Sequence, residues 1–132
     1  MNEDKAKYRG TPEYLLVYDA LTKAAKERGF ITYTWIAKTM GLPPRGHHMS
    51  REVGQMLFEI AQEERKAGRP MLSALARNAT GGMGPGFFAL ARDVGKLQDE
   101  DEAAFLAAEQ EAVYTAWSSE QQPRDAAPGG KR

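Results

Sequence analysis

The segment from residue 45 to residue 55 concentrates side chains that are suited to binding an anion. Arg45, His47, His48 and Arg51 fall within seven positions, and Gln55 follows one helical turn after Arg51. An arginine near a helix start can contact a phosphate or a base edge. The two histidines could bind phosphate when protonated, or one of them could ligate a metal. A metal needs further ligands, and the sequence has no cysteine and no third histidine. We therefore expect no metal site here and keep a plain polar loop as the alternative.

The residues that precede this segment predict two helices and a short extended segment between them. The motif TPE at residues 11–13 supplies a capping hydroxyl, a proline at the first helical position and an acid in the first turn. This pattern predicts a helix that runs to about residue 28. Residues 30–33 are β-branched and aromatic, which favours an extended segment. Thr34 is then expected to cap a brief helix over residues 35–40.

Ser50 is expected to cap a third and longer helix, over residues 51–67, which Gly68 ends. Apolar spacing along this helix predicts an inward stripe made of Val53, Leu57, Ile60 and Ala61. The polar side chains are expected toward the outside, namely Arg51, Gln55, Glu59, Gln62, Glu63 and Lys66. The carboxylates of Glu59, Glu63 and Glu64 would repel phosphate if they faced it.

The second half of the chain begins with a run in which strand and helix signals compete. We assign residues 71–77 to a strand, because the glycine-rich loop 81–86 follows and suits a hairpin turn. Residues 87–94 are expected to return as a strand or to pass into a helix. The acidic residues 99–102 then open a final helix over residues 103–117. Its docking side chains are expected to be Phe105, Leu106, Val113, Tyr114 and Trp117.

This order of elements is that of a winged helix-turn-helix: helix, short strand, helix, loop, helix, strand, glycine loop, strand. We therefore predict an α+β, mainly α fold, a winged helix-turn-helix-like domain with an added C-terminal helix. The single domain is expected over residues 11–117. Residues 1–10 are expected to form a flexible N-terminus, and residues 118–132 a disordered tail.

The charges of this chain of 132 residues are unevenly distributed, although the net charge is zero. Lys and Arg number six against five Asp and Glu in residues 1–30, nine against five in residues 31–97, and three against eight in residues 98–132. A basic middle suggests that this region meets an anionic partner. The absence of cysteine excludes disulfides and a cysteine nucleophile. With no signal-peptide core and no apolar run of roughly 20 residues, we expect a soluble cytoplasmic protein that does not enter membranes.

Three stretches together resemble a known family. They are ITYTWIAKTMGLPP, SREVGQML and RPMLSALARN, and with the glycine loop they cover about residues 31–86. They resemble the DNA-binding domain of the alkylguanine-DNA alkyltransferases and the alkyltransferase-like proteins. Residues 51–54 match the family's Arg-x-Val-Gly element, which opens the recognition helix. The resemblance implies a small winged helix, a phosphate-contacting role for Tyr33, and an Arg51 that enters the base stack.

The same resemblance places Ser73 near the position of the family's alkyl-accepting cysteine. The sequence has no cysteine anywhere, and no Cys-His-Arg motif is present. A serine hydroxyl without a neighbouring base is a poor nucleophile. Alkyl transfer is therefore excluded.

The element order and the basic middle predict a non-catalytic protein that binds double-stranded DNA. Its third helix and a wing formed by the glycine loop would straddle a groove of the duplex. No pair of carboxylates with a histidine suggests acid–base catalysis, so we expect no enzyme activity and no cofactor. The residues expected at the interface are Tyr33, Arg45, His47, His48, Arg51, Gln55, Arg69, Arg77, Gly82 and Gly84.

Two other classes of function stay open at this point. A small accessory or counter-defence protein of a bacterium or phage could bind a protein partner through its acidic surfaces, or a small nucleotide through the glycine loop. That loop could cradle a phosphate, although it lacks the Lys-Ser/Thr ending of a P-loop. A homodimer is the third hypothesis, with Phe105, Val113 and Trp117 of the final helix at its interface.

Overall fold

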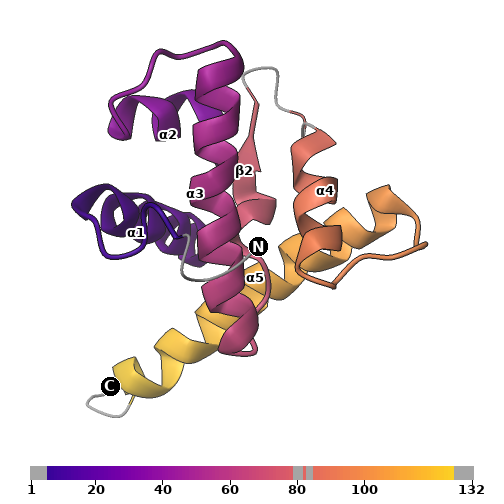
Figure 1. Ribbon diagram of the computed structural model, residues 1–132. Helices are drawn as coiled ribbons and strands as arrows, with labels where there is room; N and C mark the ends of the chain where they lie inside the picture. The colour runs from indigo at the N-terminus through magenta and orange to yellow at the C-terminus, as the bar shows by residue number, and fades with distance from the viewer. Residues whose placement is uncertain (1–5, 79–81, 83–84, 127–132) are drawn as a thin grey trace.

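The structure is a computed structural model that describes residues 6–78, 82 and 85–126. It is mainly helical with a small two-stranded sheet, which confirms the α+β, mainly α class. Figure 1 shows α3 at the centre, α1 and α2 on one side of it, α4 on the other, and α5 running diagonally across the lower half. In chain order the elements are α1 (Pro12–Glu27), β1 (Ile31–Thr32), α2 (Tyr33–Thr39), α3 (His47–Lys66), the 3-10 helix η2 (Leu72–Leu75), β2 (Ala76–Arg77), α4 (Pro85–Asp93) and α5 (Glu102–Ala126).

The core lies where η2 meets α1, α3 and α5. All four side chains of η2 are buried, which places this short helix in the middle of the packing rather than on the surface. The core also holds large side chains from four helices, among them Leu21, Ile36, Met56, Ile60 and Phe87. Burying each such side chain contributes on the order of 2 kcal/mol, so these contacts hold the helices around η2.

Local capping explains the first two helices. Thr11 caps α1 as predicted, and its hydroxyl accepts the backbone N–H of Tyr14 at 3.1 Å. The predicted cap of α2 was wrong by two residues. Thr32 rather than Thr34 accepts the N–H of Trp35, at 3.0 Å, because Thr32 holds the extended backbone that a cap requires. Tyr33 is consequently the first residue of α2.

The start of α3 was also predicted wrongly. The helix begins at His47, and its cap is Gly46, whose φ of 103° favours glycine. Ser50 lies inside the first turn, where its backbone N–H already donates to the carbonyl of Gly46 at 3.0 Å. Ser50 therefore cannot be the cap, and both histidines belong to the helix rather than to a loop. The end of α3 at Lys66 agrees with the prediction within one residue.

The predicted β-hairpin was wrong. Residues 71–77 form η2 and then the two-residue strand β2, which pairs with β1 in parallel, with Ile31 opposite Ala76. After the glycine loop the chain enters α4, and no strand follows β2 in the described residues. A hairpin joins antiparallel strands, whereas β2 is reached from β1 only through α2 and α3. The turn that begins the loop is closed by Asn78, whose N–H donates to the carbonyl of Gly82 at 2.9 Å.

The final helix docks on the core through the side chains that the sequence indicated. Val113 and Tyr114 are buried, while Phe105, Leu106 and Trp117 are partly buried against the core. The helix α5 continues to Ala126, past the predicted end at Trp117 and into the segment assigned to a disordered tail. A helix end is read from capping signals, and polar residues can continue a helix once its earlier turns are packed. Residues 127–132 of that predicted tail lie outside the described residues.

Candidate nucleic-acid interface

A groove of about 840 Å³ lies between α3 and α4. Its buried lining is apolar and includes Val53, Leu57, Phe87 and Leu90. Polar side chains complete the lining, namely Tyr33, Thr34, Arg45, Ser50, Gln55, Ser73, Asn78 and Asp93. An apolar cleft with a few placed polar groups is the usual form of a binding site for a planar or small ligand.

Ser73 stands out among the residues that line this groove. It is 1% exposed, and its Oγ atom has no hydrogen-bond partner among the described residues. A buried hydroxyl without a partner costs on the order of 1–3 kcal/mol. The hydroxyl is therefore able to accept or donate a hydrogen bond to a molecule that enters the groove.

Two glycines line the same groove from facing helices, Gly54 on α3 and Gly86 on α4. Both are exposed, and a Cβ atom added at either position would meet nothing within 4 Å. Neither position has a positive φ, so the backbone conformation does not require glycine there. Glycine within a helix is about 1 kcal/mol less favourable than alanine. Because packing within the chain does not explain Gly54, its missing side chain suits the close approach of an outside molecule to the backbone of α3.

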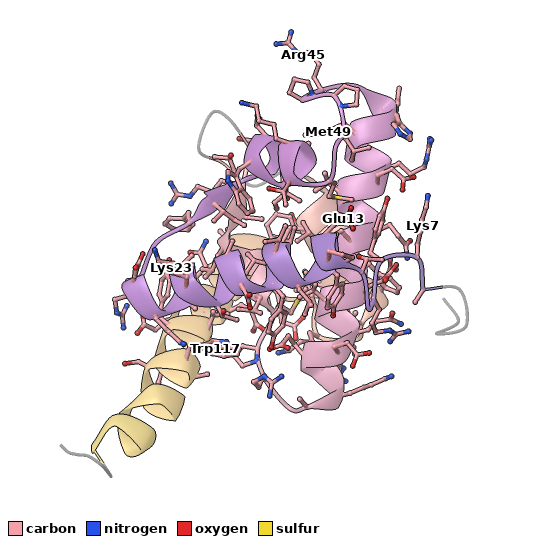
Figure 2. All side chains as sticks on the ribbon, turned by 90° about the vertical axis from the view of Figure 1, so that its left-hand side faces the viewer. Lys7, Glu13, Lys23, Arg45, Met49 and Trp117 are labelled. Atoms are coloured by element: carbon pink, nitrogen blue, oxygen red, sulfur yellow. The ribbon has the colours of Figure 1, made fainter. Side chains whose placement is uncertain are left out.

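A basic cluster formed by Arg45, His47, His48 and Arg51 lies at the start of α3, beside the open end of the groove. All four residues are exposed, and the Nη2 atom of Arg51 lies 3.4 Å from Nδ1 of His48. Figure 2 shows Arg45 projecting from this end of the molecule, away from the body. The exposed guanidinium groups of Arg45 and Arg51, with two imidazoles beside them, form a surface that attracts phosphate.

Tyr33 borders the groove from the start of α2. The side chain is half-buried, and burial raises its pKa above the ordinary value. The phenol therefore stays neutral at physiological pH and offers a hydrogen bond without a negative charge that would repel phosphate.

The acidic side chains of α3 do not lie where the sequence predicted. Glu59, expected outside, is 1% exposed and accepts the backbone N–H groups of Lys7, Tyr8 and Arg9 at 2.7, 2.9 and 2.8 Å. Burial alone would raise the pKa of Glu59, but the bonds from Gln55 and from these three N–H groups hold it below its usual range. The N-terminal segment 7–9, expected to be flexible, is thus bound along α3.

Glu64 is buried in the same way, at the far end of α3. It is 1% exposed and accepts Arg69 Nε at 2.8 Å and the hydroxyl of Tyr18 at 2.9 Å. These satisfied carboxylates face the protein and not the solvent. The repulsion of phosphate is therefore weaker than it would be if Glu59 and Glu64 lay on an outer face, and the charge of Glu64 is offset by Arg69.

The residues predicted for the interface do not all lie at the groove. Tyr33, Arg45 and Gln55 line the groove, and His47, His48 and Arg51 lie beside it. The two remaining arginines point elsewhere. Arg69 is paired with Glu64, and Glu64 lies about 20 Å from Arg51 along the axis of α3. Arg77 lies over the ring of Phe30, with its guanidinium carbon 3.2 Å from the ring centroid. Gly82 takes part in the turn at Asn78, and Gly84 lies outside the described residues.

The sequence did not single out Ser50 or Gly86 for the site, it named Asn78 only together with the glycine loop, and it treated Gly54 only as part of the Arg-x-Val-Gly match. Gly54 carried a usable signal, because an isolated glycine inside a predicted helix is a feature that needs a reason. The other residues come from segments that are distant in sequence. Only the tertiary packing of α3 against α4 brings them to one groove.

No family model, no curated protein and no solved structure matches this chain. Within residues 6–78, 82 and 85–126, no group of three or more His, Asp or Glu side chains is arranged to hold a metal ion. In the same part of the chain, no helix has both the length and the apolar character needed to cross a membrane. Function is therefore inferred from the geometry of the groove and the basic cluster.

Proposed function

We propose that this protein is a non-catalytic DNA-binding protein that places the first half of α3 against a duplex. The observation that carries the proposal is the basic cluster of Arg45, His47, His48 and Arg51, exposed at the mouth of the groove between α3 and α4. Exposed arginines and histidines at one end of the protein are the side chains that contact phosphate groups of DNA.

Arg51, Gly54 and Gln55 lie at positions i, i+3 and i+4 of α3 and therefore share one side of the helix. Arg51 reaches outward, Gly54 lets the DNA approach the helix backbone closely, and Gln55 follows one turn later. The helices α2 and α3 follow one another and pack against each other, which supports a helix-turn-helix role in which α3 would read the groove. The resemblance of SREVGQML to the Arg-x-Val-Gly element of the alkyltransferase-like family supports the same orientation.

The interface is small, and its affinity rests on a few cations. If the two arginines of the basic cluster contact phosphates, the logarithm of the binding constant falls with the logarithm of salt concentration with a slope of about −1.8. The absence of any base beside Ser73 among the described residues supports binding without chemistry.

The test is a fluorescence-anisotropy titration of labelled duplex DNA at low and at physiological salt. Arg51→Ala is expected to lower the affinity by about tenfold or more, the usual effect of removing an arginine that contacts a phosphate or a base. Arg65→Ala is the matched control, because Arg65 is an exposed arginine near the opposite end of the same helix. An equal loss in the two variants, or no saturable binding of the wild-type protein at low salt, overturns the proposal.

A small nucleotide is the second candidate, and the unpartnered Ser73 hydroxyl in an apolar groove favours it. A base would lie against Phe87 and Leu90, with its phosphate at Arg45. Isothermal titration calorimetry with mononucleotides distinguishes the two functions. Binding of a mononucleotide that is lost in Ser73→Val, together with no binding of duplex DNA, would favour the nucleotide.

A further inference from the structure

Glu52 connects the N-terminal segment to the basic cluster. Its carboxylate accepts the Lys7 ammonium at 2.7 Å and the Tyr8 hydroxyl through Oε1, and its Oε2 lies 3.8 Å from Nε of Arg51. The Glu52 side chain is 9% exposed, whereas those of Lys7 and Arg51 are 57% and 68% exposed. One nearly buried carboxylate is thus shared by two exposed cations.

The nearer cation satisfies this carboxylate. The hydrogen bond from Lys7, followed by that from Tyr8, lowers the pKa of Glu52 below its usual range, so Glu52 is ionised at neutral pH. A buried charge needs a partner, and the contact with Lys7 is the shorter of its two ion pairs. The guanidinium of Arg51 therefore remains largely exposed to solvent.

The position of Lys7 does not depend on the Lys7 side chain itself. Glu59 accepts the backbone N–H groups of residues 7, 8 and 9, which anchors this segment along α3. Figure 2 shows Lys7 on the same side of the molecule as the start of α3, and well away from Lys23 on α1. The backbone anchor brings one more cation next to the basic cluster.

We propose that the N-terminal segment 7–9 is a docked basic arm of the DNA interface, in which Lys7 neutralises Glu52 and so keeps Arg51 available to phosphate. Without Lys7, Arg51 is the other ion-pair partner that Glu52 has among the described residues, and its guanidinium is drawn back against α3. The binding surface then loses two phosphate contacts through the removal of one charge. This inference rests on the proposed DNA binding and assigns Lys7 two roles, a phosphate contact of its own and the positioning of Arg51.

The test uses the full-length chain with Lys7→Met, Glu52→Gln and the double variant, measured by anisotropy on the same duplex over a range of salt. Lys7→Met is expected to lower the affinity by about tenfold or more and to reduce the salt slope by about 1.8, which corresponds to two phosphate contacts. In the Glu52→Gln background the same change is expected to reduce the slope by only about 0.9, the contribution of Lys7 alone. Lys23→Met, which removes an exposed lysine that pairs with Glu27, is the charge control and should leave the affinity unchanged.

Equal losses from Lys7→Met in the two backgrounds overturn the inference, because Lys7 would then act as an independent cation. An unchanged affinity in Lys7→Met overturns it while the proposed function stands. Failure of the wild-type protein to bind duplex DNA removes the proposed function and this inference together. The NMR signal of the Arg51 Nε–H group, followed without DNA, gives a second readout. The chemical shift of this signal should change in Lys7→Met and should not change in Lys23→Met. An unchanged chemical shift in Lys7→Met overturns the proposed capture of Arg51 by Glu52.

Discussion

The carboxylate of Glu59 accepts the backbone N–H of Tyr8 at 2.9 Å, across 51 positions of sequence. The same carboxylate holds the neighbouring N–H groups of Lys7 and Arg9, so one buried side chain organises the N-terminal segment. A hydrogen bond to a charged group contributes more than one between neutral groups. Glu59 is therefore a central structural residue of α3, and its removal has predictable effects on stability.

We predict that Glu59→Ala lowers the free energy of unfolding by about 3 kcal/mol, because it leaves three N–H groups without their acceptor. Urea denaturation followed by circular dichroism measures this change. The control is Gln62→Ala, which removes a half-exposed amide from the same helix and should change the stability by less than about 0.5 kcal/mol. A loss no larger than that of the control would contradict the anchoring role of Glu59.

The stability that Glu59 contributes should also depend on pH. The hydrogen bonds to its carboxylate lower the folded-state pKa below the unfolded value of about 4.3. The contribution is therefore complete above the unfolded pKa and is lost as the pH falls through the folded one. The difference in melting temperature between the wild-type protein and Glu59→Gln should shrink below about pH 4, and a constant difference down to pH 2 would contradict the assignment.

Arg69→Ala should destabilise the protein without weakening DNA binding. Arg69 is the cation that neutralises the buried carboxylate of Glu64, and removing one partner of such a pair costs on the order of 3 kcal/mol. Its place at the far end of α3 from Arg51 predicts less than about a twofold change in affinity for duplex DNA once folding is complete. Urea denaturation and anisotropy at low temperature measure the two quantities. A selective loss of affinity would show that Arg69 belongs to the interface after all.

Gly54→Ala should stabilise the protein and weaken DNA binding. A Cβ atom at this exposed helical position meets nothing within 4 Å, so the helix gains about 1 kcal/mol. If duplex DNA approaches the helix backbone here, the added methyl group separates the two surfaces, and Gly54→Leu separates them further. Thermal melts and anisotropy should therefore move in opposite directions along the series Gly, Ala, Leu. An affinity that is insensitive to both substitutions would exclude a close approach at Gly54.

Ser73→Ala should leave the stability unchanged or raise it by up to about 1 kcal/mol. The hydroxyl is buried and has no partner among the described residues, so its removal relieves a desolvation penalty. Differential scanning calorimetry measures the shift in melting temperature. A drop of several degrees would indicate that the hydroxyl makes a stabilising hydrogen bond in solution.

Local chemistry in the sequence was enough to predict several elements. The motif at residues 11–13 started α1, and the extended preference of residues 30–33 located β1, which covers residues 31–32 because Tyr33 already begins α2. The glycine at residue 68 ended α3 within one residue. Each of these signals acts within one turn of the backbone, through a cap, a side-chain preference or a positive φ. The basic segment around Arg51 was visible for the same reason, because its members are close in sequence.

The tertiary structure decided the features that depend on distant segments. Polarity assigned Glu59 to the outer face, but a buried carboxylate is stable when three N–H groups from residues 7–9 satisfy it. Residues 71–77 carried strand signals, yet the space among α1, α3 and α5 holds η2 and a two-residue strand parallel to β1. The groove between α3 and α4 has no counterpart in any one stretch of sequence. The sequence by itself therefore determined the approximate positions of α1, α2, α3 and α5 and where the cations gather. Long-range packing and hydrogen bonding decided the helical form of residues 72–75 and 85–93, which side chains face inward and which surface the cations border.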